Sequence, residues 1–281
     1  MKISVIIPAL DEESYLPNLL SDLRKQTFRD FEIIVADAGS KDATRKIAKG
    51  SGAKVVEGGK PAVGRNNGAK AAQGEFLFFF DADVRIPKTF LRNAYQEMYD
   101  KFIDLATCEF TALSDKVRDK VIFDIFNINI KLVRLTNPHA MGLAIFISKR
   151  LFDRVGGFDE SIKIMEDHDL VRRAAKFRPL RILKKPKMRV SMRRFEAEGR
   201  IQVLLKSMHM VLYRTFLGEI RKDIIEYEFG NYDERRLAKR RKDLADFNKG
   251  LDDSYDKNQI RSKAAKLLDL LKAKKKSKRG P

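Results

Sequence analysis

The stretch FLFFFDADV, residues 76–84, contains the pattern that decides the fold of this chain. Five apolar residues run without interruption and end at two carboxylates, Asp81 and Asp83, which only Ala82 separates. A continuous apolar run that ends in polar residues is typical of a strand buried on both faces of a parallel sheet. The segment therefore predicts an α/β protein in which a buried strand carries paired negative charge to the edge of the sheet.

Segments of strand and helix character alternate around this run. Apolar, β-branched stretches predict strands at residues 3–10, 31–40, 53–59 and 75–84, and the segments between them predict helices at 11–26, 41–52 and 62–74. Such alternation favours a mostly parallel sheet with helices on both faces. Because parallel strands share one carboxyl edge, residues 8–12, 37–40 and 81–83 should line one rim, where open sheets bind ligands.

The second half of the chain mixes helices with shorter strands. Apolar residues at helical spacing predict amphipathic helices at 117–135 and 200–220, and polar residues open a third helix at 163–177. Residues 141–161 predict a strand, a helix and a Gly-Gly turn, and a short strand is expected within 178–190.

Composition bounds the class of protein. The single cysteine, Cys108, excludes an internal disulfide and a cysteine-rich metal site, and suits a reducing compartment. The N-terminus has no signal-peptide pattern, and no apolar run approaches the roughly 18 residues of a membrane span. We therefore expect a cytoplasmic protein that is soluble or peripheral on the inner face of a membrane.

The positive charge of the chain is concentrated at its end. Residues 235–281 hold 17 Lys and Arg against 6 Asp and Glu, a net +11 of the total +19. Such a basic tail attracts nucleic acid or anionic lipid, although it can also be a solvated segment that serves solubility. The sequence leaves these alternatives open.

The two aspartates at the strand end suit a hard cation. Mg²⁺ and Mn²⁺ take oxygen ligands, commonly one or two protein carboxylates together with substrate phosphate oxygens. A strand that simply ends in an Asx turn would show the same Asp-x-Asp pattern. Asp81 and Asp83 are therefore candidate metal ligands, but this pattern alone does not distinguish the two readings.

Several segments in order resemble the family 2 glycosyltransferases of GT-A fold. They are VIIPALDEESYLPNLLSDL, EIIVADAGSKDAT, GRNNGAKAAQGEFLFFFDADV, GGFDE and MEDHDLVRR, and together they span about residues 1–177. The resemblance implies a GT-A-like nucleotide-sugar-binding and catalytic domain at 1–190. We expect an amphipathic helical segment at 191–234 that completes the acceptor side. A charged, basic helical tail, partly disordered at its end, would follow at 235–281.

The resemblance also implies an activity and its site. The chain would transfer a sugar from a UDP- or GDP-sugar to a glycan or lipid-linked acceptor, with Mn²⁺ or Mg²⁺ as cofactor. Asp83 would bind the metal directly, and Asp81 the ribose or the metal shell. Residues implied to contact the nucleotide are Pro8, Ala9, Leu10, Glu12, Asp37, Arg65, Asn66 and Asp81. The family's second acid after the second strand is here Ala38, while Asp37 could also cap a helix and Arg65 could be a surface charge.

A second acidic cluster, MEDHD at 165–169, lies at a predicted helix start. The helix dipole stabilises acids there by about 0.3–1 kcal/mol each, which explains them without catalysis. The family resemblance instead implies that Asp167 is the general base, because a sugar hydroxyl attacks well only as its proton is removed. Glu166 would position the acceptor or the loop, and a single carboxylate opposite the leaving group predicts inversion.

A third element, SMRRFEAEG at 191–199, departs from the family's processive members. Those carry Gln-x-x-Arg-Trp, whereas Ser191, Arg194 and Phe195 stand at the aligned positions, so processive polymer synthesis is in doubt. Arg194, or its neighbour Arg193, could pair with the diphosphate, because a guanidinium matches phosphate oxygens. A role at the surface is an equal alternative.

Other functions fit the sequence less well. No Gly-x-Gly-x-x-Gly follows the first strand and no Walker A motif is present, which argues against a nicotinamide dehydrogenase and a P-loop protein. The alternative from another class is a basic protein that binds nucleic acid or an anionic membrane on the same scaffold without transferase activity. The acidic rim argues against a specific nucleic-acid partner. A membrane could be bound by the two amphipathic helices and the tail.

Overall fold

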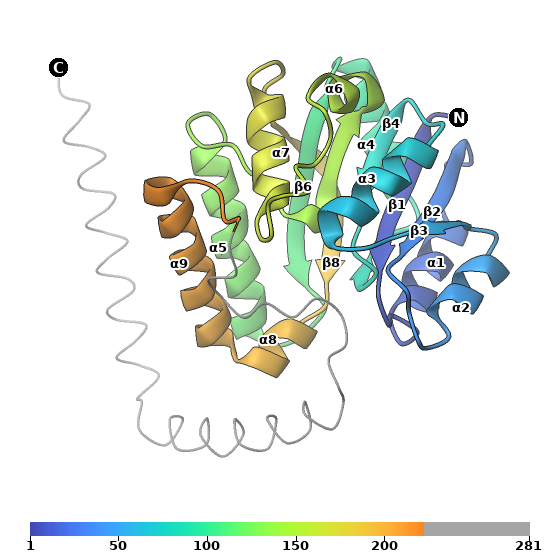
Figure 1. Ribbon diagram of the computed structural model, residues 1–281, viewed down its shortest axis with the longest axis horizontal. Helices are drawn as coiled ribbons and strands as arrows, with labels where there is room; N and C mark the ends of the chain where they lie inside the picture. The colour runs from blue at the N-terminus through green and yellow to red at the C-terminus, as the bar shows by residue number, and fades with distance from the viewer. Residues whose placement is uncertain (222–281) are drawn as a thin grey trace. The chain divides into compact units, whose positions relative to one another are not determined.

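The computed structural model describes residues 1–221 (Figure 1). Of the described residues, 1–195 and 200–221 belong to one compact unit. The predicted basic tail at 235–281 and residues 222–234 of the segment before it lie outside the described residues. The elements that position the site all belong to this compact unit.

An eight-stranded mixed sheet organises this unit, in the order β3-β2-β1-β4-β7-β6-β8-β5. The strands are β1 (Ile3–Ala9), β2 (Phe31–Asp37), β3 (Lys54–Glu57), β4 (Phe76–Phe79), β5 (Val84–Arg85), β6 (Leu105–Ala112), β7 (Ile145–Ser148) and β8 (Arg181–Val190). Strands β1 to β4 pair in parallel, while β7 runs antiparallel to both β4 and β6. The prediction of a GT-A-like, mostly parallel α/β fold is confirmed, with antiparallel β7 and β5 as the departures.

Helices cover both faces of the sheet. They are α1 (Leu16–Arg24), α2 (Thr44–Gly50), α3 (Pro61–Ala71), α4 (Phe90–Asp100), α5 (Val117–Val133), α6 (Lys149–Arg154), α7 (Glu166–Ala175), α8 (Arg193–Glu198) and α9 (Arg200–Leu217). Apolar residues of α1, α2, α4, α5 and α9 belong to one buried cluster, and those of α3, α6 and α7 to the other. Figure 1 shows the sheet between these groups.

Side chains of the apolar run at residues 76–80 pack in both buried clusters. Because side chains alternate along a strand, Phe78 and Phe80 join the first cluster while Leu77 and Phe79 join the second. All four are fully buried. Burying one such side chain stabilises the fold by about 1.5–3 kcal/mol, so this strand anchors both layers.

Two predicted elements have different limits in the structure. The helix expected from residue 11 begins at Leu16, because the acids before it accept hydrogen bonds from another loop: Asp11 from the backbone N–H of Lys41, and Glu13 from that of Ala43. The short strand expected within 178–190 is the ten-residue β8, which pairs with β6 in parallel and with β5 antiparallel. Helix α4 and strand β6 were not predicted.

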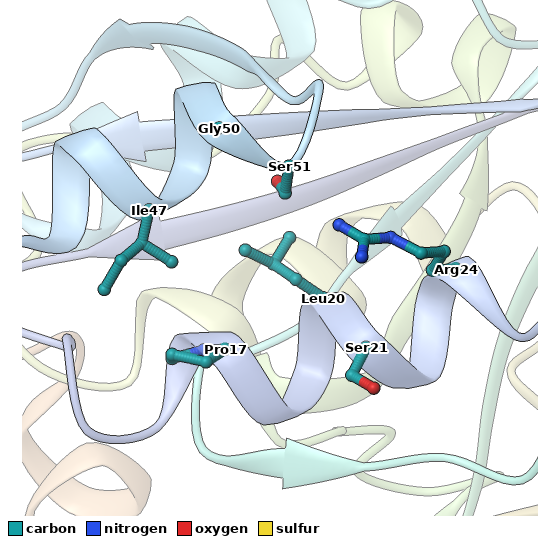
Figure 2. Close-up of a pocket in the computed structure, with 7 residues that line it drawn as sticks. All are labelled: Pro17, Leu20, Ser21, Arg24, Ile47, Gly50 and Ser51. Atoms are coloured by element: carbon teal, nitrogen blue, oxygen red, sulfur yellow. The ribbon is translucent and has the colours of Figure 1, made fainter.

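A pocket lies away from the rim. It is shallow, lies between α1 and α2, and is lined by residues that include Leu20, Arg24 and Ile47; none of its lining residues is a predicted site residue (Figure 2).

Among the helices described in residues 1–221, none combines the length and the apolar character that crossing a membrane requires.

Candidate functional site

The carboxyl edge of the parallel strands brings the predicted rim together. Strand β1 lies between β2 and β4, so the loops that follow these three strands are neighbours. The loop after β1 is tied to the loop after β2, because the backbone N–H of Glu12 donates to Thr44 Oγ1 at 2.7 Å and that of Asp11 to Ser40 Oγ at 3.0 Å. Asp11 adopts φ 52°, which turns the chain sharply there.

Asp37 lies at the end of β2 with an unsatisfied carboxylate. Its residue is 2% exposed, and neither carboxylate oxygen has a hydrogen-bond partner among the described residues. Arg45, a half-exposed side chain, lies 3.5 Å from Oδ2 as an ion pair. Buried polar atoms normally have partners, so two open acceptors at a ligand-binding edge mark a place where donors from a ligand fit.

Arg65 of α3 joins the first acid pair to the second. Its guanidinium donates to Asp81 Oδ1 at 3.0 Å and to Glu166 Oε1 at 2.6 Å. The side chains of Arg65 and Glu166 are 6% and 8% exposed, so this ion pair is shielded from water. Gly142 packs so closely on this guanidinium that an added Cβ would lie 2.5 Å from Nη2. Arg65 is thus a buried junction rather than a surface charge.

The next residue, Asn66, fixes the segment that leads to the second acid pair. Its amide donates to the carbonyl of Phe158 at 2.9 Å and to Glu160 Oε1 at 2.8 Å, and its Oδ1 accepts from the Phe158 N–H at 2.9 Å. Gly157 in the predicted Gly-Gly turn has φ 70°, and a Cβ there would lie 2.7 Å from Asn66 Oδ1. Asn66 therefore positions the chain and is 9% exposed.

Arg193 forms a second junction, which is half-buried. It donates to both carboxylate oxygens of Glu12, at 2.7 and 2.6 Å, and its Nε lies 2.8 Å from Asp83 Oδ2. The guanidinium carbon also stacks 4.5 Å from the ring centroid of Tyr15. Of the two arginines considered at this element, Arg193 makes these contacts to Glu12 and Asp83, and the role expected for Arg194 stays a prediction.

Burial shapes the electrostatics of these acids. It raises the pKa of Glu12 to about 7, against the opposing effect of Arg193. It also raises the pKa of Asp83, and Asp81 adds to that effect. The pKa of Glu166 rises to about 7 through burial and the charge of Asp167. Burial disfavours the charged form of these carboxylates. The rim therefore suits a ligand that brings compensating positive charge or hydrogen-bond donors.

Asp167 sits at the head of α7, held by backbone donors. Its Oδ2 accepts from the N–H of Gly142 at 2.6 Å, and its Oδ1 from the N–H of His168 at 2.8 Å. Met165 before the helix has φ 67°, a strained left-handed conformation that aims the acids. Burial raises the pKa of Asp167 above the ordinary aspartate value. The second lone pairs of its oxygens can still accept a proton.

The remaining predicted residues lie along the same rim. Pro8, Ala9 and Leu10 end β1, and Pro8 packs near Gly64 of α3, whose added Cβ would lie 3.6 Å from the Pro8 Cβ. Sequence reasoning did not single out Gly142, whose missing side chain makes room for Arg65. No pattern in the sequence pointed to it, because its constraint comes from a residue 77 positions away (residues 65 and 142).

The donor atoms at the rim fit a hard divalent cation. Asp81 and Asp83 offer carboxylate oxygens, and the arginine ion pairs engage Oδ1 of the first and Oδ2 of the second. No cluster of three or more His, Cys, Asp or Glu ligands occurs within residues 1–221. A cation here would therefore need oxygens from a bound ligand to complete its coordination.

A family model matches more than half of the chain. A model of glycosyl transferase family 2 matches residues 4–156. Curated relatives include a glycosyltransferase of Rickettsia typhi, 28% identical over 181 residues, which are 60% of this chain and 57% of the relative. Another is the poly(ribitol-phosphate) beta-N-acetylglucosaminyltransferase TarS of Staphylococcus aureus, 28% identical over 182 residues, 59% of this chain and 31% of the relative. This chain thus matches well under two thirds of the length of these relatives.

Solved structures share the fold. S. aureus TarS 1–349 in complex with UDP-GlcNAc superposes with a TM-score of 0.57 at 20% identity, covering 85% of this chain and 79% of that one. The mannosyltransferase PcManGT of Pyrobaculum calidifontis, solved with GDP-Man and Mn²⁺, has a TM-score of 0.56 at 19% identity, covering 74% and 64%. At these identities the likeness establishes the fold.

Replacing the buried arginine junction should destabilise the protein strongly. Arg65→Gln leaves Glu166 buried without its cation, and breaking a buried pair on one side typically costs about 3–5 kcal/mol of unfolding free energy. Urea unfolding followed by circular dichroism measures this loss. Arg178→Gln is the matched control: Arg178 is 59% exposed and shares Asp104 with Arg150, so its loss should cost under about 1 kcal/mol. Equal losses in the two variants would contradict the role given to Arg65.

Proposed function

Since the chain belongs to glycosyl transferase family 2, we propose that it is a glycosyltransferase that transfers a sugar from a nucleotide diphosphate to an acceptor hydroxyl with inversion. The observation that carries this proposal is the gathering of Asp81, Asp83, Glu166 and Asp167 around the buried Arg65 and the half-buried Arg193. Acids from the end of one strand and the head of one helix thereby face the same edge of the sheet.

The donor nucleotide would occupy the rim formed by β1, β2 and β4. The open carboxylate of Asp37 would accept hydrogen bonds from N–H groups of the base, with Pro8, Ala9 and Leu10 bordering the nucleoside. Both UDP- and GDP-sugars remain candidates, because TarS was solved with UDP-GlcNAc and PcManGT with GDP-Man. Arg193 lies beside Asp83 and would reach the diphosphate from there.

Asp83, with Asp81 beside it, would hold Mg²⁺ or Mn²⁺ against the diphosphate. The cation would stabilise the negative charge that grows on the leaving group. Glu12 keeps Arg193 in place through two hydrogen bonds, so the guanidinium is already oriented when the donor arrives. Arg65 and Asn66 are positioning residues in this scheme, because Arg65 holds Glu166 and Asn66 holds the chain at Phe158.

Asp167 would be the general base. Its backbone hydrogen bonds from Gly142 and His168 fix its orientation, and its raised pKa brings its basicity closer to that of a useful proton acceptor. The acceptor hydroxyl would give its proton to Asp167 as its oxygen bonds to the anomeric carbon and the bond to the diphosphate breaks. A single displacement of this kind inverts that carbon. The acceptor would be a glycan or a lipid-linked compound.

The donor is tested by calorimetric titration of UDP, GDP and their sugar conjugates, with Mn²⁺ and with chelator. We expect one nucleotide series to bind only with metal, and Asp83→Ala to weaken that binding at least ~10-fold, because a charge-assisted metal ligand is lost. Metal alone should bind weakly to the wild type, because the described residues contain no group of three or more His, Cys, Asp or Glu side chains that could hold the ion. If no nucleotide binds to the folded protein, the transferase proposal fails and a nucleic-acid-binding function on the same scaffold takes its place.

The base is tested by Asp167→Asn. We expect kcat to fall by about 10²–10⁴, with donor affinity nearly unchanged. In the wild type, the rate should fall as pH drops through the raised pKa of Asp167, because the base must be ionised, so the acid limb should lie above an ordinary aspartate pKa. Asp153→Asn, in an exposed carboxylate of α6, is the control and should keep full activity. An unchanged kcat in Asp167→Asn would remove Asp167 from the mechanism.

We also propose that α5 and α9 dock on an anionic membrane. Large apolar side chains on α5 are exposed at helical spacing: Val117, Val121, Ile125, Ile128 and Leu132. A second set is exposed on α9: Ile201, Leu205, Met208 and Val211. Arg200 joins the starts of the two helices by an ion pair to Asp119. A soluble surface rarely carries such contiguous apolar stripes without a partner.

The charged side chains on α5 favour binding to anionic lipid. Arg118, Lys120 and Lys131 are exposed there, against one exposed acid, Asp124. Each basic side chain near an anionic surface contributes about 1 kcal/mol. Docking of this face would serve a lipid-linked acceptor.

Flotation with phosphatidylglycerol-containing vesicles tests the docking. The full chain should float, and the double variant Ile125→Gln with Leu132→Gln should bind at least ~10-fold more weakly, because two exposed apolar anchors are lost. Phe102→Gln, a 90% exposed aromatic at the end of α4, is the matched control and should float like the wild type. Wild type that stays in solution, or a double variant that floats equally well, would overturn the proposal.

A further inference from the structure

Each nitrogen of the Arg193 guanidinium faces a carboxylate oxygen of the protein. Nη1 and Nη2 donate to Oε2 and Oε1 of Glu12 at 2.7 and 2.6 Å, and Nε lies 2.8 Å from Oδ2 of Asp83. The fork that suits the oxygens of a diphosphate is therefore directed at two carboxylates. One of them, Asp83, is the residue proposed to hold the divalent cation, so Arg193 stands beside a candidate metal ligand.

The main chain stations Arg193 at this place. Val190, the last residue of β8, pairs with Val84 of β5, and the N–H of Ser191 donates to the carbonyl of Asp83 at 3.3 Å. Arg193 follows two residues later, at the start of α8. The end of β8 is therefore attached to the same residue whose carboxylate Arg193 contacts, and this proximity does not depend on the side chains alone.

Glu12 and Tyr15 would keep Arg193 in place if its contact with Asp83 were lost. Glu12 holds both Nη atoms, and the ring centroid of Tyr15 lies 4.5 Å from the guanidinium carbon. The side chains of Arg193 and Glu12 are 15% and 7% exposed, so this anchor is shielded from water. The Nε contact to Asp83 can thus be exchanged for another acceptor while the paired hydrogen bonds to Glu12 remain.

Arg65, the other arginine of the rim, is placed differently. Its side chain is 6% exposed, and the backbone of Gly142 packs so closely on it that an added Cβ would lie 2.5 Å from Nη2. Its hydrogen bonds run to Asp81 and to the buried Glu166. Arg65 is therefore fixed by packing, and Arg193 is the arginine of this pair whose contact with an acid can change.

A divalent cation and Arg193 compete for the charge of Asp83. A cation bound to this carboxylate would lie close to a guanidinium that is 2.8 Å from the same group, and like charges repel strongly where little water screens them. A diphosphate changes this balance, because it brings negative charge of its own. Its oxygens can complete the coordination of the cation and also accept a hydrogen bond from the guanidinium.

We propose that Arg193 shields Asp83 from divalent cations until a nucleotide diphosphate binds, and that its Nε–H then donates to a diphosphate oxygen instead of to Asp83. The hydrogen bonds to Glu12 remain throughout. Cation and nucleotide would thus bind as a pair, each tightening the binding of the other by the same factor. The inference deepens the proposed function and rests on it, because the proposed donor supplies the diphosphate.

Binding of Mn²⁺ alone tests the shielding. Electron paramagnetic resonance of free Mn²⁺ measures its affinity for the full chain without nucleotide, in buffer above neutral pH so that the carboxylates are ionised. Arg193→Gln should bind Mn²⁺ at least ~10-fold more tightly than the wild type, because the like charge beside Asp83 is removed. Adding Asp83→Ala to that variant should abolish the gain. Arg92→Gln, in an exposed arginine of α4, is the control for the change in net charge and should bind like the wild type.

Calorimetry with UDP or GDP at saturating Mn²⁺ tests the exchange. Arg193→Gln should bind the nucleotide at least ~10-fold more weakly than the wild type, because a charge-assisted hydrogen bond to the diphosphate is lost. Arg193→Lys keeps the charge without the fork, so it should bind Mn²⁺ alone as weakly as the wild type and lose part of the nucleotide affinity. If Arg193→Gln does not fold by circular dichroism, a folded Arg193→Lys with full nucleotide affinity would overturn the exchange.

Opposite changes in the two affinities of Arg193→Gln support the inference. Weaker binding of both Mn²⁺ and nucleotide would show a structural role only and would overturn it, as would an unchanged affinity for Mn²⁺ or for nucleotide. If no nucleotide binds to the folded wild type, the proposed function fails. Tighter Mn²⁺ binding by Arg193→Gln would then still support the shielding of Asp83, and unchanged binding would contradict it.

Discussion

Negative charge gathered at the rim needs compensation, and two arginines supply part of it in this protein. Arg65 pairs with Asp81 and Glu166, while Arg193 pairs with Glu12 and Asp83. The desolvation of these carboxylates raises the pKa of three of them even with the arginines present. Without either guanidinium, the acids would have to take up protons or open the site to water. The layout of the rim depends on this balance more than on any single loop.

The sequence predicted the part of the molecule that local patterns control. The aromatic run at 76–80 has a strand's length and ends in acids, and the alternation of apolar segments before it determines a parallel sheet with a common carboxyl edge. The placement of Asp37 and Asp81 on one rim followed from that topology alone. The ordered motifs then supplied the family, and the family match over residues 4–156 confirmed it. The individual roles of the site residues stay predictions.

Long-range contacts account for what the sequence did not predict. Helix α1 starts five residues late because Asp11 and Glu13 bind the loop after β2, a partner about 30 positions away. At Arg193 and Arg194, adjacent residues with identical chemistry, the sequence carries no signal that Arg193 pairs with Glu12 and Asp83, which lie far away along the chain. Gly142 looks like any loop glycine until Arg65 lies against it. In each case the deciding neighbour is distant in sequence and close in space.

The ion pairs of Arg65 and Arg193 span 101 and 181 positions of the chain. A nascent chain that has left the ribosome as far as residue 165 already holds β1, β2, β3, β4 and β7, yet it lacks Glu166, Asp167 and Arg193. During that interval its rim carries Glu12, Asp37, Asp81 and Asp83 against Arg65, so the unfinished edge is acidic and repels itself. Contacts of such separation close late in folding. The protein can therefore form most of its sheet before the residues that complete the two sets of ion pairs have been synthesised.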